Sequence, residues 1–184
     1  MASITVVSGC LGTGKTTLCR VLAYAEPAGL HFATDTFYHF PAHLLDPTTP
    51  ESHAQNTTLI KAMGRAAAAF VEGGYEVFLD GVIGPWFLPT LLREWDAVAH
   101  IEYVILRTTL EEALARVLRR DGPGISPRVH VMHEAFAALG SYAEHVIETT
   151  ARSAEEVHAE FIQRRYRGEF LLDVRLLTLG DRIA

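Results

Sequence analysis

Short apolar runs alternate along the chain with longer segments in which apolar residues recur every three or four positions. The runs predict strands near residues 4–8, 30–34, 75–80, 101–106 and 145–149. The longer segments predict helices near residues 15–25, 52–72, 86–95, 109–120, 127–139 and 153–165. Strands that alternate with helices usually form a parallel sheet that is covered on both faces. The pattern therefore predicts an α/β fold, a three-layer sandwich around a five-stranded parallel sheet.

Local signals support several of these boundaries. Gly73 and Gly74 are expected to end the long helix before the third strand. Ser153 and Glu156 have the spacing of a capping box at the start of the last helix. Residues 40–51 are rich in proline and predict a loop. After the last helix an edge strand is one possibility, because apolar residues alternate with others at Leu172, Val174 and Leu176.

Composition and charge narrow the functional classes. The 184 residues suffice for one compact domain, and 49% of them are hydrophobic, enough for a sizeable core. The formal net charge is -6, from 16 basic and 22 acidic residues, which disfavours a nucleic-acid surface because such surfaces need many Lys and Arg contacts to phosphate. Two cysteines without metal-ligand or disulfide spacing fit a reducing, cytoplasmic setting. We expect no signal peptide before the strand at Ile4, and no membrane span, since no apolar run approaches about 18 residues.

Residues 9–17 carry the strongest motif in the chain. They read Gly-Cys-Leu-Gly-Thr-Gly-Lys-Thr-Thr and match G-x-x-x-x-G-K-[ST], between the first predicted strand and the first predicted helix. Such a loop wraps backbone N–H groups around phosphate oxygens. Lys15 is expected to reach the β- and γ-phosphates of a nucleoside triphosphate, and Thr16 to hold Mg²⁺. The nucleotide-binding residues predicted here are Gly9, Gly12, Thr13, Gly14, Lys15, Thr16 and Thr17.

Two aspartates follow predicted strands, at the edge of an open α/β sheet where ligands bind. Asp35 comes after the second strand and is a candidate base for the proton of an attacking hydroxyl. The alternatives for Asp35 are binding of the metal's water shell and capping of the next turn. Asp80 closes the third strand in the pattern of a Walker B aspartate that binds Mg²⁺ through water, although Asp-Gly turns end many other strands.

Arginines gather around a glycine-rich break at residues 121–124, and they are Arg116, Arg119, Arg120 and Arg128. Arginines beside a flexible segment can close over a triphosphate and stabilise the charge of the transition state. A solvated helix end is the alternative explanation. We expect at least one of Arg116, Arg120 and Arg128 to act on the phosphates, and we place a short lid at about residues 116–128.

Candidates for binding a phosphate acceptor lie on both sides of the third strand. Polar residues open the long helix on the Asp35 side, namely Ser52, His53, Gln55 and Asn56. Capping of the helix explains Ser52 equally well. Aromatic residues suit a partly apolar acceptor, and suit core packing equally well, at Phe37, Tyr38, Phe40, Trp86 and Phe87. Only Arg65 and Arg93 are available between residues 36 and 95 to bind a carboxylate, so a neutral or cationic acceptor is favoured.

Four pieces of the chain resemble the small P-loop kinases grouped with chloramphenicol phosphotransferase, the zeta-toxin kinases and the short AAA-type ATP-binding proteins of bacteria. The pieces are Gly9 to Thr17, Asp35-Thr36-Phe37, Val77 to Gly84 and the arginine helix with its break at 116–128. The similarity runs from about residue 3 to residue 165. It implies a five-stranded parallel core, a lid, and ATP-dependent phosphorylation of a small-molecule hydroxyl with Asp35 as candidate base. It does not imply the acceptor, because members differ mainly in the segments corresponding to 36–60 and 81–95.

We therefore predict a kinase-like P-loop domain over residues 1–165 and a C-terminal extension, residues 166–184, of unassigned role. The expected activity is transfer of the γ-phosphate of ATP to a small-molecule hydroxyl, with Mg²⁺ as cofactor. Lys15, Asp35 and Arg120 are the predicted catalytic residues, Arg116 and Arg120 also bind the nucleotide, and Thr16 and Asp80 hold the metal. The alternative is a regulator that uses ATP as a switch, which would have no need of a base such as Asp35. A polynucleotide kinase is disfavoured by the acidic balance.

Overall fold

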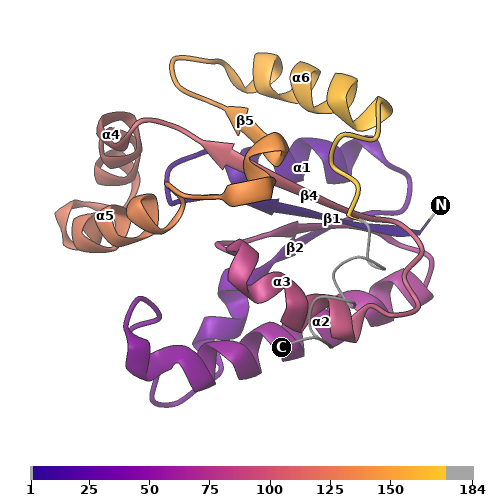
Figure 1. The fold of residues 1–184 in the computed structure, drawn as a ribbon, viewed down its shortest axis with the longest axis horizontal. Helices are drawn as coiled ribbons and strands as arrows, with labels where there is room; N and C mark the ends of the chain where they lie inside the picture. Colours follow the sequence, from indigo (N-terminus) through magenta and orange to yellow (C-terminus); the bar gives the residue numbers. More distant parts are fainter. Residues whose placement is uncertain (1, 173–184) are drawn as a thin grey trace.

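The computed structural model of the protein describes residues 2–172 and contains one parallel sheet (Figure 1). The strands are β1 (Ser3–Ser8), β2 (Gly29–Ala33), β3 (Glu76–Asp80), β4 (Ile101–Arg107) and β5 (Val146–Glu148). Their order is β2-β3-β1-β4-β5, and every pairing between them is parallel. The five predicted strands and the predicted fold class are confirmed. The central position of β1 puts the segment that follows it in the middle of one edge of the sheet.

Helices cover both faces of this sheet, as predicted. On one face lie α1 (Lys15–Ala25) and α6 (Ala154–Tyr166), and on the other lie α2 (His53–Glu72) and α3 (Leu88–Glu94). The helices α4 (Leu110–Asp121) and α5 (Ser126–Ala135) lie beyond the carboxyl ends of the strands, at the left of Figure 1. Between these elements the chain forms short 3-10 turns, at Thr34–His39, Pro50–Ser52, Pro85–Phe87, Pro123–Ile125 and Gly140–His145.

Two predicted helices are shorter in the structure. The helix expected at 86–95 divides into the turn Pro85–Phe87 and α3, because Pro89 fits the first turn of a helix and not its interior. The helix expected at 127–139 ends at Ala135. The buried Phe136 and Leu139 that follow it belong to the core that the sheet forms with α2 and α3.

Neighbouring positions of β1, β3 and β4 supply two separate hydrophobic cores. Ile4 and Val6 of β1 pack with α2 and α3, whereas Val7 packs with α1 and α6. On β4, Ile105 belongs to the first core and Leu106 to the second. All of these side chains are buried, as expected for a parallel sheet with helices on both faces. The two cores hold the carboxyl ends of the strands in a fixed arrangement, from which the loops project.

The predicted helix signals are confirmed. Gly73 is the C-cap of α2, and Gly74 has a φ of 90°, which a residue with a side chain rarely adopts. Ser153 and Glu156 form a complete capping box at the start of α6.

The described part of the C-terminal extension packs on the domain. The amide of Tyr103 donates to the carbonyl of Phe170, and the amide of Leu172 donates to the carbonyl of Ile101, so this segment pairs antiparallel with the start of β4. Phe170 is fully buried and stacks on Phe161 of α6. Of the possible edge strand, Val174 and Leu176 lie outside the described residues.

A charged cluster lies at the amino end of the sheet. Glu102 of β4 is 1% exposed, and its carboxylate accepts a hydrogen bond of 2.7 Å from the hydroxyl of Thr5. Arg165 of α6 lies 2.9 Å from the same carboxylate and also pairs with Glu76. Each buried charge in this cluster therefore has a partner of opposite sign. Among residues 2–172, no helix is both long and apolar enough to cross a bilayer.

Candidate active site

The phosphate loop joins β1 to α1 and fits tightly against its surroundings. Gly9 has a φ of 132°, and a Cβ atom there would lie 2.1 Å from the carbonyl oxygen of Leu106. Gly12 has a φ of 80°, and its Cβ would lie 2.7 Å from the carbonyl oxygen of Ala113. Both positions therefore require glycine, because a side chain would meet fixed backbone. The hydroxyl of Thr13 donates to the carbonyl of Cys10 at 2.9 Å and braces the loop from within.

Lys15 begins α1 and curls back over the loop. Its side-chain nitrogen donates to the carbonyl of Cys10 at 2.8 Å, and the residue is only 9% exposed. Burial lowers the pKa of the Lys15 ammonium, and the carboxylates of Asp80 and Asp35 oppose that shift. The ammonium group is thus held at the loop with one hydrogen bond, to the carbonyl of Cys10. Phosphate oxygens bound there would offset the free-energy cost of burying its charge.

A cavity of about 630 Å³ opens at the carboxyl ends of the strands. It brings together most of the residues that the sequence singled out, namely Gly12, Gly14, Lys15, Thr16, Thr17, Asp35, Asp80, Arg116, Arg120 and Arg128. Gly9 and Thr13 do not line this cavity, because Gly9 lies under the loop against β4 and Thr13 turns toward a second cavity. We refer to the larger cavity as the main cavity.

Asp80 ends β3 and is buried at the wall of the main cavity. Its Oδ2 lies 3.0 Å from Nε2 of His31 on the neighbouring strand β2, and its backbone carbonyl accepts from the hydroxyl of Thr34. Asp80 and Thr16 offer a carboxylate and a hydroxyl, the oxygen ligands that Mg²⁺ prefers. No group of three or more His, Cys, Asp or Glu side chains within residues 2–172 could hold a metal. This donor set fits Mg²⁺, which keeps most of its shell for water and phosphate oxygens.

Asp35 lies in the 3-10 turn that follows β2, at the wall of the main cavity. The N-cap of that turn is Ala33, and no side chain caps it, so the capping alternative has no support. The part of the chain that the structure describes gives the carboxylate no hydrogen-bond partner. It is near enough to Lys15 and Arg120 to favour their charged forms, so it opposes the lowering of the Lys15 pKa by burial and adds to the raised pKa of Arg120. Asp35 therefore presents an unpaired carboxylate to the space in front of the phosphate loop.

The arginines differ in what they contact. Arg116 donates to the carbonyl of Gly12 at 3.1 Å and to that of Thr149 at 3.2 Å, so it ties α4 to the phosphate loop and to the end of β5. Arg120 forms hydrogen bonds of 2.7 to 3.0 Å with the carboxylate of Asp121. This contact raises the pKa of Arg120, and Asp35 and Asp80 act in the same direction. The three arginines predicted near the phosphates all line the main cavity, whereas Arg119 does not.

Arg128 lies in the first turn of α5 and faces the loop between the second and third strands. Its Nε lies 3.6 Å from Oδ2 of Asp46, and the other carboxylate oxygen, Oδ1, accepts hydrogen bonds from the amide and hydroxyl of Thr48. These bonds and Arg128 lower the pKa of Asp46. The pair connects the predicted lid to the far rim of the main cavity.

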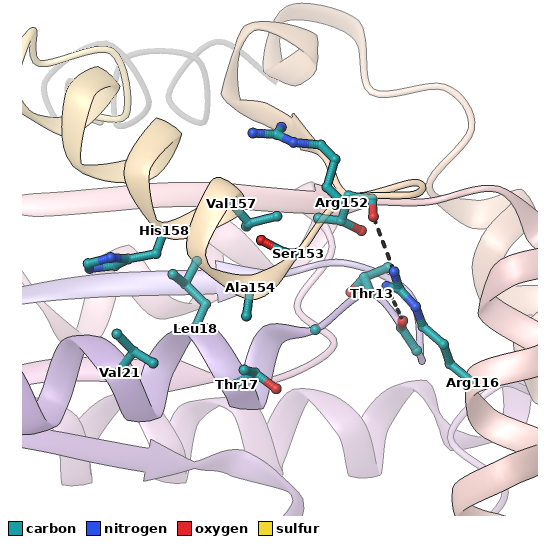
Figure 2. A pocket seen from close by; sticks show the side chains of 13 residues that line it. Thr13, Thr17, Leu18, Val21, Arg116, Arg152, Ser153, Ala154, Val157 and His158 are labelled. Carbon is teal, nitrogen blue, oxygen red and sulfur yellow. Dashed lines mark hydrogen bonds between the residues drawn. The ribbon is translucent and has the colours of Figure 1, made fainter.

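A second cavity of about 220 Å³ lies between α1 and α6 (Figure 2). Figure 2 shows Leu18 and Val21 of α1 facing Val157 and His158 of α6. Arg116 reaches into the junction between this cavity and the phosphate loop, where dashed lines mark its bonds to two carbonyls. The two cavities share Gly12, Gly14, Thr17 and Arg116. A ligand over the phosphate loop can therefore extend into both.

A family model described as an AAA domain matches residues 6–138, most of the chain. The chain belongs to this AAA-domain family. The matched region contains the phosphate loop, Asp35, Asp80 and the whole of α4 and α5. No curated protein matches the chain by sequence.

Solved structures of kinases and of an antibiotic resistance protein have the same fold as this chain. An unliganded sugar kinase from Janibacter sp. is 16% identical with a TM-score of 0.64, over 89% of this chain and 94% of that one. An APS kinase from Mycobacterium tuberculosis, in complex with AMPPNP and APS, is 14% identical with a TM-score of 0.64, over 88% and 96%. A tunicamycin resistance protein from Deinococcus radiodurans is 19% identical with a TM-score of 0.61, over 93% and 98%. At these identities the similarity shows the fold, which is that of the small P-loop kinases.

Sequence reasoning missed two features of this AAA-domain protein. The contact of His31 with Asp80 depends on the pairing of β2 with β3, and no local signal in the sequence gives that pairing. The second cavity depends on α6 lying beside α1, which follows from the strand order. The capping box at Ser153 was the available signal, because it placed the start of α6, where this cavity lies.

Proposed function

We propose that the protein transfers the γ-phosphate of ATP to a hydroxyl group of a small molecule. The observation that carries this proposal is the position of Asp35. Its unpaired carboxylate lies in a cavity that begins at the phosphate loop and is large enough for a second molecule. A nucleotide-binding switch would have no use for such a group, whereas a kinase needs a base or an orienting acceptor for its nucleophile.

The proposed arrangement of ATP uses both cavities. The smaller cavity has apolar walls from α1 and α6 that suit a planar base, and the shared residues of the loop would hold the phosphates. Lys15 would contact the β- and γ-phosphates, and Arg116 would keep the loop and α4 together. The smaller cavity would thus be the part of the site that binds the nucleoside of ATP.

The reaction would take place in the main cavity. The acceptor hydroxyl would lie between Asp35 and the γ-phosphate, give its proton to the carboxylate, and form the new oxygen–phosphorus bond as the bond to the β-phosphate oxygen breaks. Arg120 would leave Asp121 and stabilise the charge on the transferred group. Mg²⁺, held by Thr16 and Asp80, would neutralise phosphate charge when bound. The lid, residues 116–128, would close over the phosphates and exclude water.

The test is acceptor-stimulated ADP formation. A panel of hydroxyl-bearing metabolites and antibiotics is added to the protein with ATP and Mg²⁺, and ADP release is measured. Slow basal hydrolysis that one acceptor raises strongly is the expected result, because water is a poor substitute for a positioned hydroxyl. Stimulation by a protein partner, with no acceptor active and no dependence on Asp35, would instead support the regulatory alternative.

A further inference from the structure

Asn56 of α2 is a residue of the main cavity and carries a buried hydrogen-bond acceptor without a partner among the described residues. The residue is 5% exposed and lines the cavity. Its amide nitrogen donates to the carbonyl of Pro47 at 2.9 Å and to the hydroxyl of Ser52 at 2.9 Å. The Ser52 hydroxyl donates in turn to the carbonyl of Thr49, so it accepts from the amide. These contacts fix which end of the amide carries the nitrogen. The Oδ1 atom is buried without a partner within residues 2–172.

A buried carbonyl oxygen without a donor is rare and costs folding free energy. That cost is recovered when a ligand brings an N–H or O–H group to the oxygen. The nitrogen of Asn56 already braces the loop before α2, so the oxygen is the atom of the amide whose hydrogen bond is still to be made.

Apolar side chains line much of the main cavity beside Asn56. Ile60 and Met63 follow it along α2 at helical spacing and line the same cavity. Trp86 and Phe87 line it from the segment after β3, and Trp86 remains 49% exposed. A ligand group that reaches Asn56 therefore lies beside a wall that favours apolar or aromatic surface.

The cations that line this cavity all have partners among the described residues. Lys15 and Arg116 hold carbonyls of the phosphate loop, Arg120 holds Asp121, and Arg128 lies beside Asp46. The first two belong to the phosphate end, and each of the others lies beside a carboxylate. Asp35 adds a negative charge that has no such partner. An acceptor that carried a carboxylate or phosphate near Asn56 would find no free cation there.

We propose that Asn56 recognises the phosphate acceptor, and that the acceptor is an uncharged or cationic alcohol that carries an apolar group and a second hydrogen-bond donor. The second donor bonds to Oδ1 of Asn56, the apolar group packs against Ile60, Met63 and Trp86, and the reacting hydroxyl faces Asp35. This inference rests on the proposed phosphotransfer and names the class of substrate for it.

Three matched probes test the class by isothermal titration calorimetry with a non-hydrolysable ATP analogue present. Phenyl glycol has an aryl group and two hydroxyls, and phenethyl alcohol lacks the benzylic one. Mandelate keeps the benzylic hydroxyl and has a carboxylate in place of the hydroxymethyl group. We expect phenyl glycol to bind about tenfold more tightly than phenethyl alcohol, as one hydrogen bond to a buried acceptor allows, and mandelate to bind most weakly. Equal affinity of the two alcohols, tighter binding of mandelate, or no binding of any probe would overturn the proposal. This comparison uses the unmodified protein and does not depend on a variant.

A pair of variants distinguishes recognition of the acceptor by Asn56 from its role in holding the loop before α2. Asn56→Ala removes Oδ1 together with the bonds to Pro47 and Ser52, whereas Ser52→Ala disturbs the same loop and leaves Oδ1 in place. Asn56→Ala should abolish the preference for phenyl glycol, and Ser52→Ala should retain it. Loss of the preference in both variants alike would make Asn56 a brace of the loop and would overturn its role in recognition.

The two proposals fail in different ways. If phenyl glycol binds with a preference that depends on Asn56 but no acceptor raises ADP formation, phosphotransfer is wrong and the recognition site stands. If an acceptor raises ADP formation equally in the unmodified protein and in Asn56→Ala, phosphotransfer stands and the role of Asn56 is wrong.

Discussion

The two ends of the sheet differ in how fully their charged side chains are paired. At the amino end, Glu102 has bonds to Thr5 and Arg165, and Arg165 also pairs with Glu76. At the carboxyl end, the buried Lys15 has one loop carbonyl as its hydrogen-bond partner, and the exposed Asp35 has no hydrogen-bond partner in the described chain. Completed charge networks support a fold, whereas incomplete ones are a feature of sites that wait for a ligand. The difference indicates that the carboxyl end is built for binding and chemistry and the amino end for stability.

The largest expected effect is that of Lys15→Ala. Removal of the ammonium group takes away the cation of the β- and γ-phosphates, so productive use of ATP should fall below detection while the fold is retained. Steady-state ADP formation and a thermal melt measure the two quantities. Lys61→Ala is the matched control, because Lys61 is exposed on α2 and is the only other lysine of the chain. Turnover near that of the control would contradict the assignment of the phosphate loop.

Asp35→Asn should reduce transfer by roughly 10²–10⁴-fold and leave ATP affinity largely intact, the usual result when a general base is lost. Nucleotide affinity and acceptor phosphorylation are measured separately. Asp96→Asn, an exposed aspartate after α3, controls for the loss of one negative charge. A collapse of ATP affinity together with transfer would make Asp35 a metal or structural residue.

At the amino end, Arg165→Ala should act on stability and not on nucleotide binding. Glu102 would keep its burial and lose its cation, which typically costs about 3 kcal/mol of unfolding free energy. Urea unfolding measures this loss. Arg167→Ala removes an exposed arginine whose contact with Glu169 spans 3.4 Å, and it should cost less than about 1 kcal/mol. Equal costs for the two variants would remove the contrast between the ends of the sheet.

The smallest effect is expected in the lid. Binding of nucleotide should change the protection of its amides from hydrogen exchange without changing the fold. Arg120 and Arg128 now contact the carboxylates of Asp121 and Asp46, and phosphates would offer them another partner. Gly122 has a φ of 80° and permits a hinge next to Arg120. Hydrogen exchange of residues 116–128 should slow when a non-hydrolysable ATP analogue is added. The same exchange rate in both states would argue against a lid.

The sequence predicted what local signals determine. The strands follow from short apolar runs, the phosphate loop from a contiguous motif, and the start of α6 from Ser153 and Glu156. It did not predict contacts that depend on which strands are neighbours, such as His31 beside Asp80. It offered Asn56 only as one of four polar residues at the start of a helix. The unmet Oδ1 could not be predicted, because it results from contacts with Pro47 and Ser52 that only the folded loop provides.

The fate of the γ-phosphate tests the proposed function most directly. ATP labelled at the γ-phosphorus is incubated with the protein, Mg²⁺ and each member of a hydroxyl-bearing panel, and the labelled products are separated into organic phosphate and inorganic phosphate. We predict that one acceptor becomes a labelled phosphate ester, and that Asp35→Asn suppresses the ester while slow release of inorganic phosphate partly persists. The contradicting result is label in inorganic phosphate alone with every acceptor, at a rate that a protein partner raises and Asp35→Asn does not change.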